Sequence, residues 1–319
     1  MRFSWLAIIA VGCGTAARPQ PMPPQVVPVV QQGAAKPARM DLPVGESPMS
    51  IVVVGRALVW TDSTGALWTM AKDGSGTPKQ LSDQHLGFAF SLVVAGDHVF
   101  ASTKKDLLEI DLAAPAVTHA GIRGLADQPE AVVADDRFVY CTMFKRNEVM
   151  KIPARGGDPQ KLFEIPRGVL GISGTMLFAA SYSTGTVVTV PTSGGTPHVI
   201  ARGIPRPTAI VADETYAFVY SERDKTLRRI SLATGETTTI ADKLENSDHM
   251  VADGGSIYTF SWGKPAKLLR IAKDGTRPPV IIADDLASPY HIAIDAEAIY
   301  VTSRDQNKIV RFEKAALAR

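Results

Sequence analysis

Short apolar runs separated by turn residues recur along most of the chain, and none of them has the spacing of an amphipathic helix. One aromatic residue in each repeat lies within an apolar run that follows a turn, and these residues stand 38 to 42 positions apart, at Trp60, Phe100, Tyr140, Phe178, Phe218, Tyr258 and Tyr300. Repetition at about 40–45 residues, with only strand-like segments inside each unit, is typical of a β-propeller. The pattern therefore predicts seven blades.

The repeat around Phe218 shows the expected blade in full. Residues 209–212 form a short apolar run suited to a buried innermost strand, and 216–221 and 226–230 follow as the second and third strands. A turn containing Gly235 precedes an outer strand at 237–241. Glycine supplies the positive φ angle that tight hairpins need. Each blade is thus predicted to be a four-stranded antiparallel sheet.

The last repeat provides only three of the four strands, at 292–294, 299–302 and 308–312. When Pro48 is aligned with Pro207, residues 39–42 fall where an outer strand belongs. We therefore expect residues 38–42 to complete the seventh blade. Such closure removes the exposed sheet edges that favour aggregation. The sequence predicts one all-β domain, a seven-bladed propeller over residues 38–319.

The first residues predict export. One arginine, a short apolar run and a small residue before Cys13 are typical of a signal peptide over residues 1–12, with Cys13 as the lipidated residue. Residues 13–37 are rich in proline and predict an extended tether. Gly14, rather than an aspartate, follows the cysteine. By analogy, this favours the outer membrane of a bacterial envelope, on its periplasmic or its surface side.

Charge and cysteine content narrow the choice of partners. The chain has 34 basic and 32 acidic residues and a net charge of +2, which argues against nucleic-acid binding because that needs a clustered basic excess. Its two cysteines are Cys13 and Cys141, so no disulfide framework is expected. Cys141 lies in an apolar strand and is predicted to be a small buried hydrophobe. A closed ring of this kind is expected to be monomeric.

Equivalent positions that differ in every blade are candidates for function. Four residues after each repeat aromatic, the loop joining the second and third strands carries Thr64, Lys104, Phe144, Tyr182, Glu222, Trp262 and Arg304. In propellers this loop lies where the central channel opens. Aromatic and arginine side chains dominate binding hot spots. The set predicts a binding ring formed by Lys104, Phe144, Tyr182, Glu222, Trp262 and Arg304; the alternative is simple drift of exposed loops.

A second equivalent position concerns chemistry. At the entry to the innermost strand, nine residues before the aromatic, adjacent blades carry His249 and His291, with Glu130, Asp248 and Tyr290 beside that layer. Two imidazoles and a carboxylate could hold a divalent metal or act as base and acid. The alternative is two unrelated histidines packed at strand entries. No nucleophile elbow and no phosphate loop with lysine occurs in the sequence.

Three segments carry a resemblance to known propellers: Pro-Glu-Ala-Val-Val-Ala-Asp at 129–135, Pro-Thr-Ala-Ile-Val-Ala-Asp at 207–213 and Pro-Tyr-His-Ile-Ala-Ile-Asp at 289–295. They resemble the NHL and YWTD class of six- to seven-bladed propellers, over about 270 residues. The chain is more distantly similar to streptogramin (virginiamycin B) lyases, but their repeated Trp-Phe-Thr-Glu signature is absent. The resemblance implies the fold, while the class includes binding modules, lactone hydrolases and lyases.

Two functions follow as hypotheses. The favoured one is a non-enzymatic, lipid-anchored module that binds an envelope protein, peptide or glycan, or acts as a scaffold, through its channel mouth without a cofactor. The alternative is a metal-dependent lyase or lactone hydrolase. Because the resemblance to streptogramin lyases implies a histidine and a carboxylate around a divalent cation, its candidates are His249, His291 and Glu222, with His249 and His291 as metal ligands.

Overall fold

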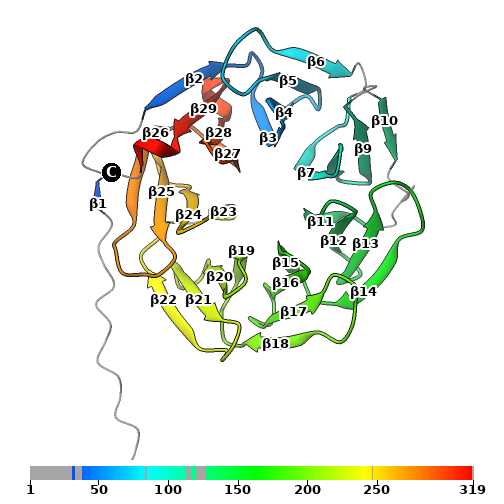
Figure 1. The fold of residues 1–319 in the computed structure, drawn as a ribbon, viewed down its shortest axis with the longest axis vertical. Helices are drawn as coiled ribbons and strands as arrows, with labels where there is room; N and C mark the ends of the chain where they lie inside the picture. Colours follow the sequence, from blue (N-terminus) through cyan, green and yellow to red (C-terminus); the bar gives the residue numbers. More distant parts are fainter. Residues whose placement is uncertain are drawn as a thin grey trace, which may run out of the picture.

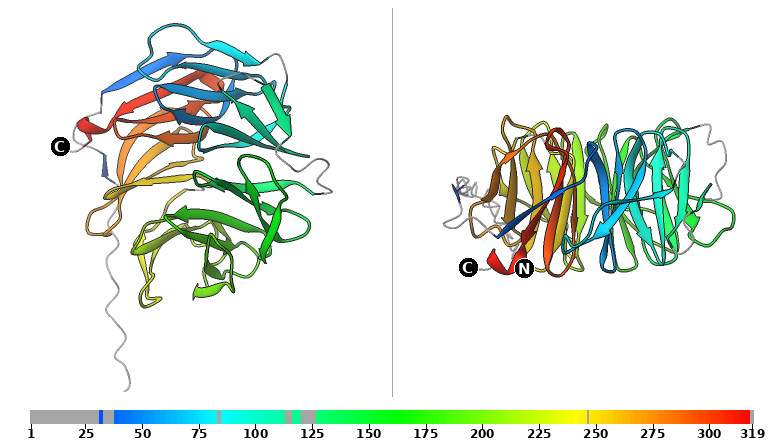
Figure 2. Two further views of the ribbon diagram at one scale, coloured as in Figure 1. Left: turned by 45° about the vertical axis from the view of Figure 1, so that its right-hand side comes forward. Right: turned by 90° about the horizontal axis from the view of Figure 1, so that it is seen from above.

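Seven β-sheets stand like blades around a central channel in the computed structural model (Figure 1). Seen from the side, the ring is a flat disc with its strands running across its thickness (Figure 2). The structure describes residues 31–32, 38–82, 85–112, 116–119, 127–245 and 247–317. The predicted signal peptide, Cys13 and all of the predicted tether except 31–32 lie outside these residues.

Each blade is ordered from the channel outward. The innermost strands are β3 (Pro48–Val54), β7 (Ala89–Ala95), β11 (Pro129–Ala134), β15 (Gly168–Ser173), β19 (Pro207–Ala212), β23 (Met250–Asp253) and β27 (Pro289–Ile294). The second strands are β4 (Ala57–Asp62), β8 (His98–Thr103), β12 (Phe138–Met143), β16 (Met176–Ser181), β20 (Tyr216–Ser221), β24 (Ser256–Ser261) and β28 (Ala298–Ser303). The third strands are β5 (Leu67–Ala71), β9 (Leu107–Asp111), β13 (Glu148–Pro153), β17 (Val187–Pro191), β21 (Thr226–Ser231), β25 (Ala266–Ala272) and β29 (Lys308–Glu313). The outer strands are β6 (Lys79–Ser82), β10 (Ala116–His119), β14 (Gln160–Glu164), β18 (His198–Ala201), β22 (Thr237–Ala241), β26 (Val280–Leu286) and β2 (Arg39–Pro43).

Three further elements complete the described part of the chain. Two short 3-10 helices, η1 (Arg304–Gln306) and η2 (Lys314–Ala316), flank β29. Strand β1 (Gln31–Gln32) pairs in parallel with β26 and gives the sixth blade a fifth strand. This short pairing lies within the segment predicted to be a tether, and nothing in the sequence pattern indicated it.

The ring closes as the sequence predicted. Strand β2 pairs antiparallel with β29, with Arg39 opposite Phe312 and Pro43 opposite Lys308. The backbone hydrogen bond from the Val44 N–H to the Asn307 carbonyl, 3.1 Å long, extends this pairing beyond the strand. The seven-bladed, four-stranded antiparallel architecture and its closure by an N-terminal strand are confirmed, with β1 as the one addition.

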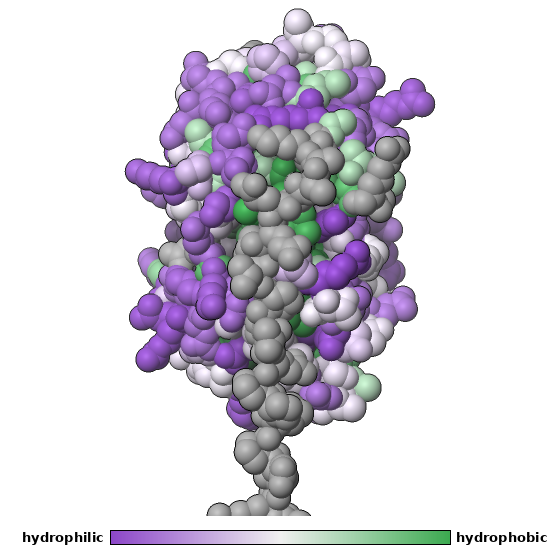
Figure 3. Space-filling model, turned by 90° about the vertical axis from the view of Figure 1, so that its left-hand side faces the viewer, coloured by the Kyte–Doolittle hydropathy of each residue, from purple (hydrophilic) through white to green (hydrophobic). Residues whose placement is uncertain are grey.

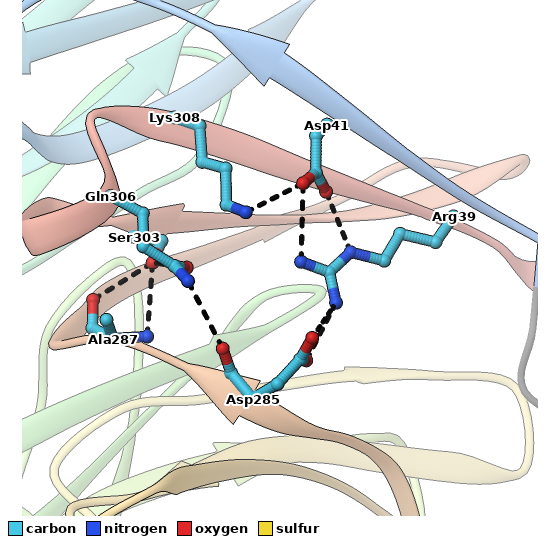
Figure 4. A network of polar contacts seen from close by, with 7 residues as sticks. All are labelled: Arg39, Asp41, Asp285, Ala287, Ser303, Gln306 and Lys308. Carbon is cyan, nitrogen blue, oxygen red and sulfur yellow. Dashed lines mark hydrogen bonds and ion pairs between the residues drawn. The ribbon is translucent and has the colours of Figure 1, made fainter.

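Charged side chains hold the closing strand to two blades at once (Figure 4). The Arg39 guanidinium contacts Asp41 on its own strand and both carboxylate oxygens of Asp285 at the edge of the sixth blade, each at 2.7 Å. Lys308 on β29 donates to Asp41, also at 2.7 Å. Because these groups are partly exposed, their ion pairs contribute little to the free energy of unfolding, and their main effect is to fix the register of β2 against its neighbours.

The hydrophobic core is divided into seven clusters, each lying between two neighbouring blades. Six of these clusters contain a repeat aromatic, and all seven aromatics are 4% exposed or less. Trp60, for example, packs with Leu42 and Tyr300 across the junction between the seventh and first blades. Cys141 is fully buried in such a cluster, as predicted. Each blade therefore depends on both of its neighbours.

The repeated aspartate of the Pro-to-Asp segments caps the turn between the first and second strands. The Asp135 carboxylate accepts from the backbone N–H of Phe138 at 2.8 Å, and Asp295 does the same for Ala298. Asp295 also bonds Lys72 in the next blade at 2.7 Å. The resemblance to known propellers thus rests on a residue with a turn-forming role, which explains why it indicates fold and says little about function.

The outer wall beside β26 is mainly hydrophilic, with only small hydrophobic areas between the charged side chains (Figure 3). Within the described residues, neither 3-10 helix nor any other helix has the length and apolar character needed to cross a membrane.

Candidate functional site

A central channel of about 660 Å³ opens at the face where the innermost strands begin. Its wall consists mainly of backbone and small or aliphatic side chains from those strands. The larger polar or aromatic side chains come from the strand entries, namely Phe90, Glu130, Asp248, His249, Tyr290 and His291. The name "mouth face" is used below for these strand entries together with the loops that join the second and third strands.

Backbone hydrogen bonds fix the predicted binding ring to the mouth face. The backbone N–H of Phe144 donates to the Gln128 carbonyl, and that of Tyr182 donates to Arg167, each at 3.0 Å. In the next blade Glu222 donates to Arg206, also at 3.0 Å. Because the acceptor in each case directly precedes an innermost strand, these bonds hold the three loops beside the entry to the channel. All six predicted ring residues, and Thr64 at the equivalent position, lie on the loops that join the second and third strands.

Exposed aromatic side chains gather on the mouth face. Four large hydrophobic side chains are exposed in the described part of the chain, and three of them belong here: Phe88, Phe144 and Trp262. Phe88 also packs edge-on against Phe90, with ring centroids 5.1 Å apart. An exposed aromatic set on one face of a rigid scaffold is typical of a binding surface.

Tyr182 is the centre of a charged cluster between the fourth and fifth blades. The guanidinium carbons of Arg167 and Arg206 lie 4.8 and 5.8 Å from the centroid of its ring. Its hydroxyl donates to the Glu222 carboxylate at 3.0 Å. Two ring residues are thus joined to each other, and the arginines are held by cation–π contacts.

Trp262 and Arg304 are held by the strand entries beside them. The Trp262 indole N–H donates to Asp248 at 3.1 Å, and Arg304 lies over the Tyr290 ring at 5.6 Å. Crowding by protein atoms at the channel raises the pKa of Asp248, while the hydrogen bond from Trp262 acts in the opposite direction. The same desolvation raises the pKa of Glu130, opposed by the charge of Arg167. Lys104 and Thr64 complete the ring on the second and first blades.

The structure brings the two predicted histidines together. The ring centroids of His249 and His291 are 3.9 Å apart, and the Phe260 ring lies parallel to His249. Burial lowers the pKa of His249 to about 4. Burial, and then the neighbouring His249, lowers the pKa of His291 well below its usual value, although a hydrogen bond to the Ile51 backbone acts against this. Both imidazoles are therefore neutral at pH 7.

The metal hypothesis needs more ligands than this pair provides. The Nδ1 atoms of both histidines are buried, and neither has a hydrogen-bond partner among the described residues. Yet across the described ranges no three His, Cys, Asp or Glu side chains are grouped closely enough to hold a metal ion. Glu222, the third candidate, is hydrogen-bonded to Tyr182 instead. Two imidazoles alone do not fit a complete metal centre, and the catalytic and metal roles of these residues stay predictions.

Several residues of the mouth face were missed by sequence reasoning. Phe88, Arg167 and Arg206 directly precede innermost strands, two or three positions before the strand-entry layer that contains His249 and His291 in other blades. Arg167 and Arg206 have positive φ angles of 47° and 49°. The number of residues between these positions and the repeat aromatic differs by one from blade to blade. They therefore do not fall at one fixed distance from the aromatic in the sequence.

Comparison with solved structures shows the same fold elsewhere. Virginiamycin B lyase from Staphylococcus aureus matches with a TM-score of 0.71 and 14% identity, over 86% of this chain and 99% of that chain. A streptogramin B lyase structure gives 0.69 and 12%, over 86% and 96%. The computationally designed Ika8 protein gives 0.62 and 10%, over 85% and 97%. No protein-family model and no curated protein matches the chain.

The chain is thus a seven-bladed β-propeller with an aromatic and charged channel mouth. Its fold is similar to that of streptogramin B lyases. At these identities the likeness establishes the fold alone, and the match to a designed protein underlines that one architecture does not select one function.

Proposed function

We propose that this protein is a non-enzymatic binding module that captures a protein, peptide or glycan partner at its mouth face. The observation that carries the proposal is that Phe88, Phe144 and Trp262 are all exposed on the one face where the channel opens. The signal peptide would direct export, and the lipid on Cys13 and the tether would then hold the module at the bacterial cell envelope, with the outer membrane as its site.

The rigidity of the mouth face supports binding. Trp262 is fixed by Asp248 and by edge-on packing against Phe260 at 5.5 Å, so little side-chain entropy is lost when a partner covers it. Tyr182 is fixed in the same way by Glu222 and Arg167. A ligand that meets pre-ordered aromatic rings gains contact area without first paying to order them.

The alternative function is a metal-dependent lyase or lactone hydrolase around His249 and His291. The two imidazoles are adjacent and neutral, so each has a lone pair that can accept a proton, but the lowered pKa of about 4 makes His249 a weak base. A catalytically inactive histidine-to-alanine variant of the S. aureus lyase has been solved with quinupristin, which makes histidine loss the natural test of this alternative. The residues present do not complete a metal site, and we derive no catalytic step.

Capture of a partner from envelope extract tests the proposal. Purified protein is immobilised beside Trp262→Ala, Phe144→Ala and His249→Ala/His291→Ala variants, and bound material is quantified. Interface hot spots cost about 2 kcal/mol or more on truncation, so we expect each aromatic variant to retain less than about a tenth of the partner. The histidine variant should retain all of it.

A matched control distinguishes the mouth face from general stickiness. Met40 is as exposed as Phe144 but lies on β2 at the outer wall, and Met40→Ala should leave capture unchanged. Equal capture by Trp262→Ala and the unchanged protein would contradict the proposal. A divalent metal that is stoichiometric in the unchanged protein and lost from the histidine variant would favour the enzyme.

A further inference from the structure

A second cavity of about 420 Å³ opens at the mouth face between the fourth and fifth blades. Its lining is polar and includes three arginines, at positions 167, 206 and 223, together with Tyr182 and the hydroxyl side chains of Ser183 and Thr184. The name "arginine pocket" is used below for this cavity. It is separate from the central channel, with which it shares no lining residue.

The three guanidinium groups have no carboxylate neutralising them directly. Other arginines of the protein, such as Arg39, Arg228 and Arg311, form ion pairs with aspartate or glutamate. Within the described part of the chain, neither Arg167, Arg206 nor Arg223 has a carboxylate oxygen within 4.0 Å. The nearby Glu222 carboxylate instead accepts the Tyr182 hydroxyl. Among the described residues the three arginines are therefore free of direct ion pairs, and the charge of Arg167 is offset only at longer range by Glu130.

The repeat explains the backbone of the pocket but not its side chains. Arg167, Arg206 and Ser288 all directly precede innermost strands, and all have φ angles between 47° and 49°. Their carbonyls accept from Tyr182, Glu222 and Arg304 respectively. Since Ser288 adopts the same conformation, the structure of the ring does not require arginine there. The fourth and fifth blades alone place arginine at this position beside a tyrosine ring.

Within the described residues, the contacts found for the guanidinium groups of Arg167 and Arg206 are cation–π contacts, with Tyr182 for both and with Phe144 for Arg167 as well. Both guanidinium groups lie over the Tyr182 ring, and a cation–π contact does not use up guanidinium N–H groups. A planar guanidinium presents its donors as a fork that matches the oxygens of a phosphoryl group. A single carboxylate would offset only part of the charge of three arginines, whereas a phosphate dianion offsets more of it.

We propose that the arginine pocket is an oxyanion site that binds a dianionic phosphate group, with Arg167, Arg206 and Arg223 as its ligands. Tyr182 acts as the platform that orients two of the arginines. The proposal deepens the proposed function and rests on it, because the phosphate would be one recognised group of a partner seated on the mouth face.

Equilibrium dialysis against radiolabelled inorganic phosphate tests this site directly, without the partner. The purified protein is dialysed at pH 7.5 and constant ionic strength set with sodium chloride, beside Arg167→Gln, Arg206→Gln and the double variant. Charge-assisted hydrogen bonds are among the stronger ones, so each single variant should weaken phosphate binding by about tenfold. Arg206→Lys keeps the charge but loses the forked pair of N–H donors, so its affinity for phosphate should lie between those of the unchanged protein and of Arg206→Gln.

Arg56→Gln is the matched control, because Arg56 is an exposed arginine in the turn between β3 and β4, at the opposite face of the ring. It should bind phosphate as the unchanged protein does, and all variants should keep the same melting temperature because the substituted side chains are exposed. Competition identifies the source of the group. If glucose 6-phosphate displaces phosphate, the site accepts a phosphomonoester; if it does not, the site takes free phosphate, and either result supports an oxyanion site.

Three results would overturn the proposal: no binding at 10 mM phosphate, equal loss in Arg56→Gln, or full binding by the double variant. If acetate displaced phosphate as well as sulfate does, the site would not distinguish a monoanion from a dianion, and this result would also overturn the proposal. Failure here is distinguishable from failure of the proposed function. Capture that depends on Trp262 can persist without phosphate binding, and phosphate binding can persist in Trp262→Ala.

Discussion

Leu42 provides the sharpest test of ring closure, because a single side chain on β2 reports on the whole seventh blade. It is 3% exposed and packs with Ile51 and Leu58 of the first blade and Ile309 of the seventh. Leu42→Ala would leave a cavity at the junction where the two ends of the ring meet. Met40, two residues earlier on the same strand, is 42% exposed and gives a matched control.

The expected cost follows from burial. Replacing a buried leucine by alanine costs about 2–5 kcal/mol, and the lower half of that range applies because Leu42 lies between exposed neighbours on an outer strand. In a domain of this size about 2.5 kcal/mol corresponds to a fall of roughly 5–10 °C in melting temperature. Met40→Ala should remain within about 0.5 kcal/mol.

Urea unfolding followed by tryptophan fluorescence measures both variants, and Trp60 lies in the affected cluster. Removal of residues 19–30 should leave the unfolding midpoint unchanged, while removal through residue 43 should lower it by more than Leu42→Ala does. If Leu42→Ala and Met40→Ala unfold at the same midpoint, β2 does not close the ring, and the reasoning from the repeat is refuted.

Two further predictions concern buried titratable groups. The pKa of His249 is about 4 in the folded protein against 6.5 for a free histidine. As the pH falls, the unfolded chain therefore takes up a proton before the folded protein does. The free energy of unfolding should fall between about pH 6.5 and pH 4, by up to roughly 3 kcal/mol. Urea midpoints should therefore fall less steeply with pH in His249→Gln, and parallel curves would contradict this. Burial raises the pKa of the Cys141 thiol to about 12. Iodoacetamide at pH 8 should therefore modify Cys141 only after the protein unfolds, as measured by peptide mass. Rapid labelling of the folded protein would count against a closed core.

The fold could be predicted from the sequence because each repeat aromatic performs the same task. Trp60, Phe218 and Tyr300 each fill an interblade cluster, so burial imposes an apolar aromatic residue at nearly constant spacing. Closure could be predicted for a similar reason, since an unpaired β29 would leave one blade short of a strand. The pairing of β1 with β26 could not, because two glutamines carry no hydrophobic pattern.

The site was only partly predictable, and the reason is geometric. His249 and His291 occupy equivalent positions in adjacent blades, so the repeat alone indicated their closeness. Arg167 and Arg206 both lie over Tyr182, and among the described residues the contact between Arg206 and Tyr182 is matched only one blade earlier, where Arg167 also lies over Phe144. Repetition reveals what all blades share, whereas a binding site depends on what single blades add. Recognition should therefore be sought where single blades depart from the repeat. These departures are the three arginines and Tyr182 between the fourth and fifth blades, and the exposed aromatic side chains on the same face.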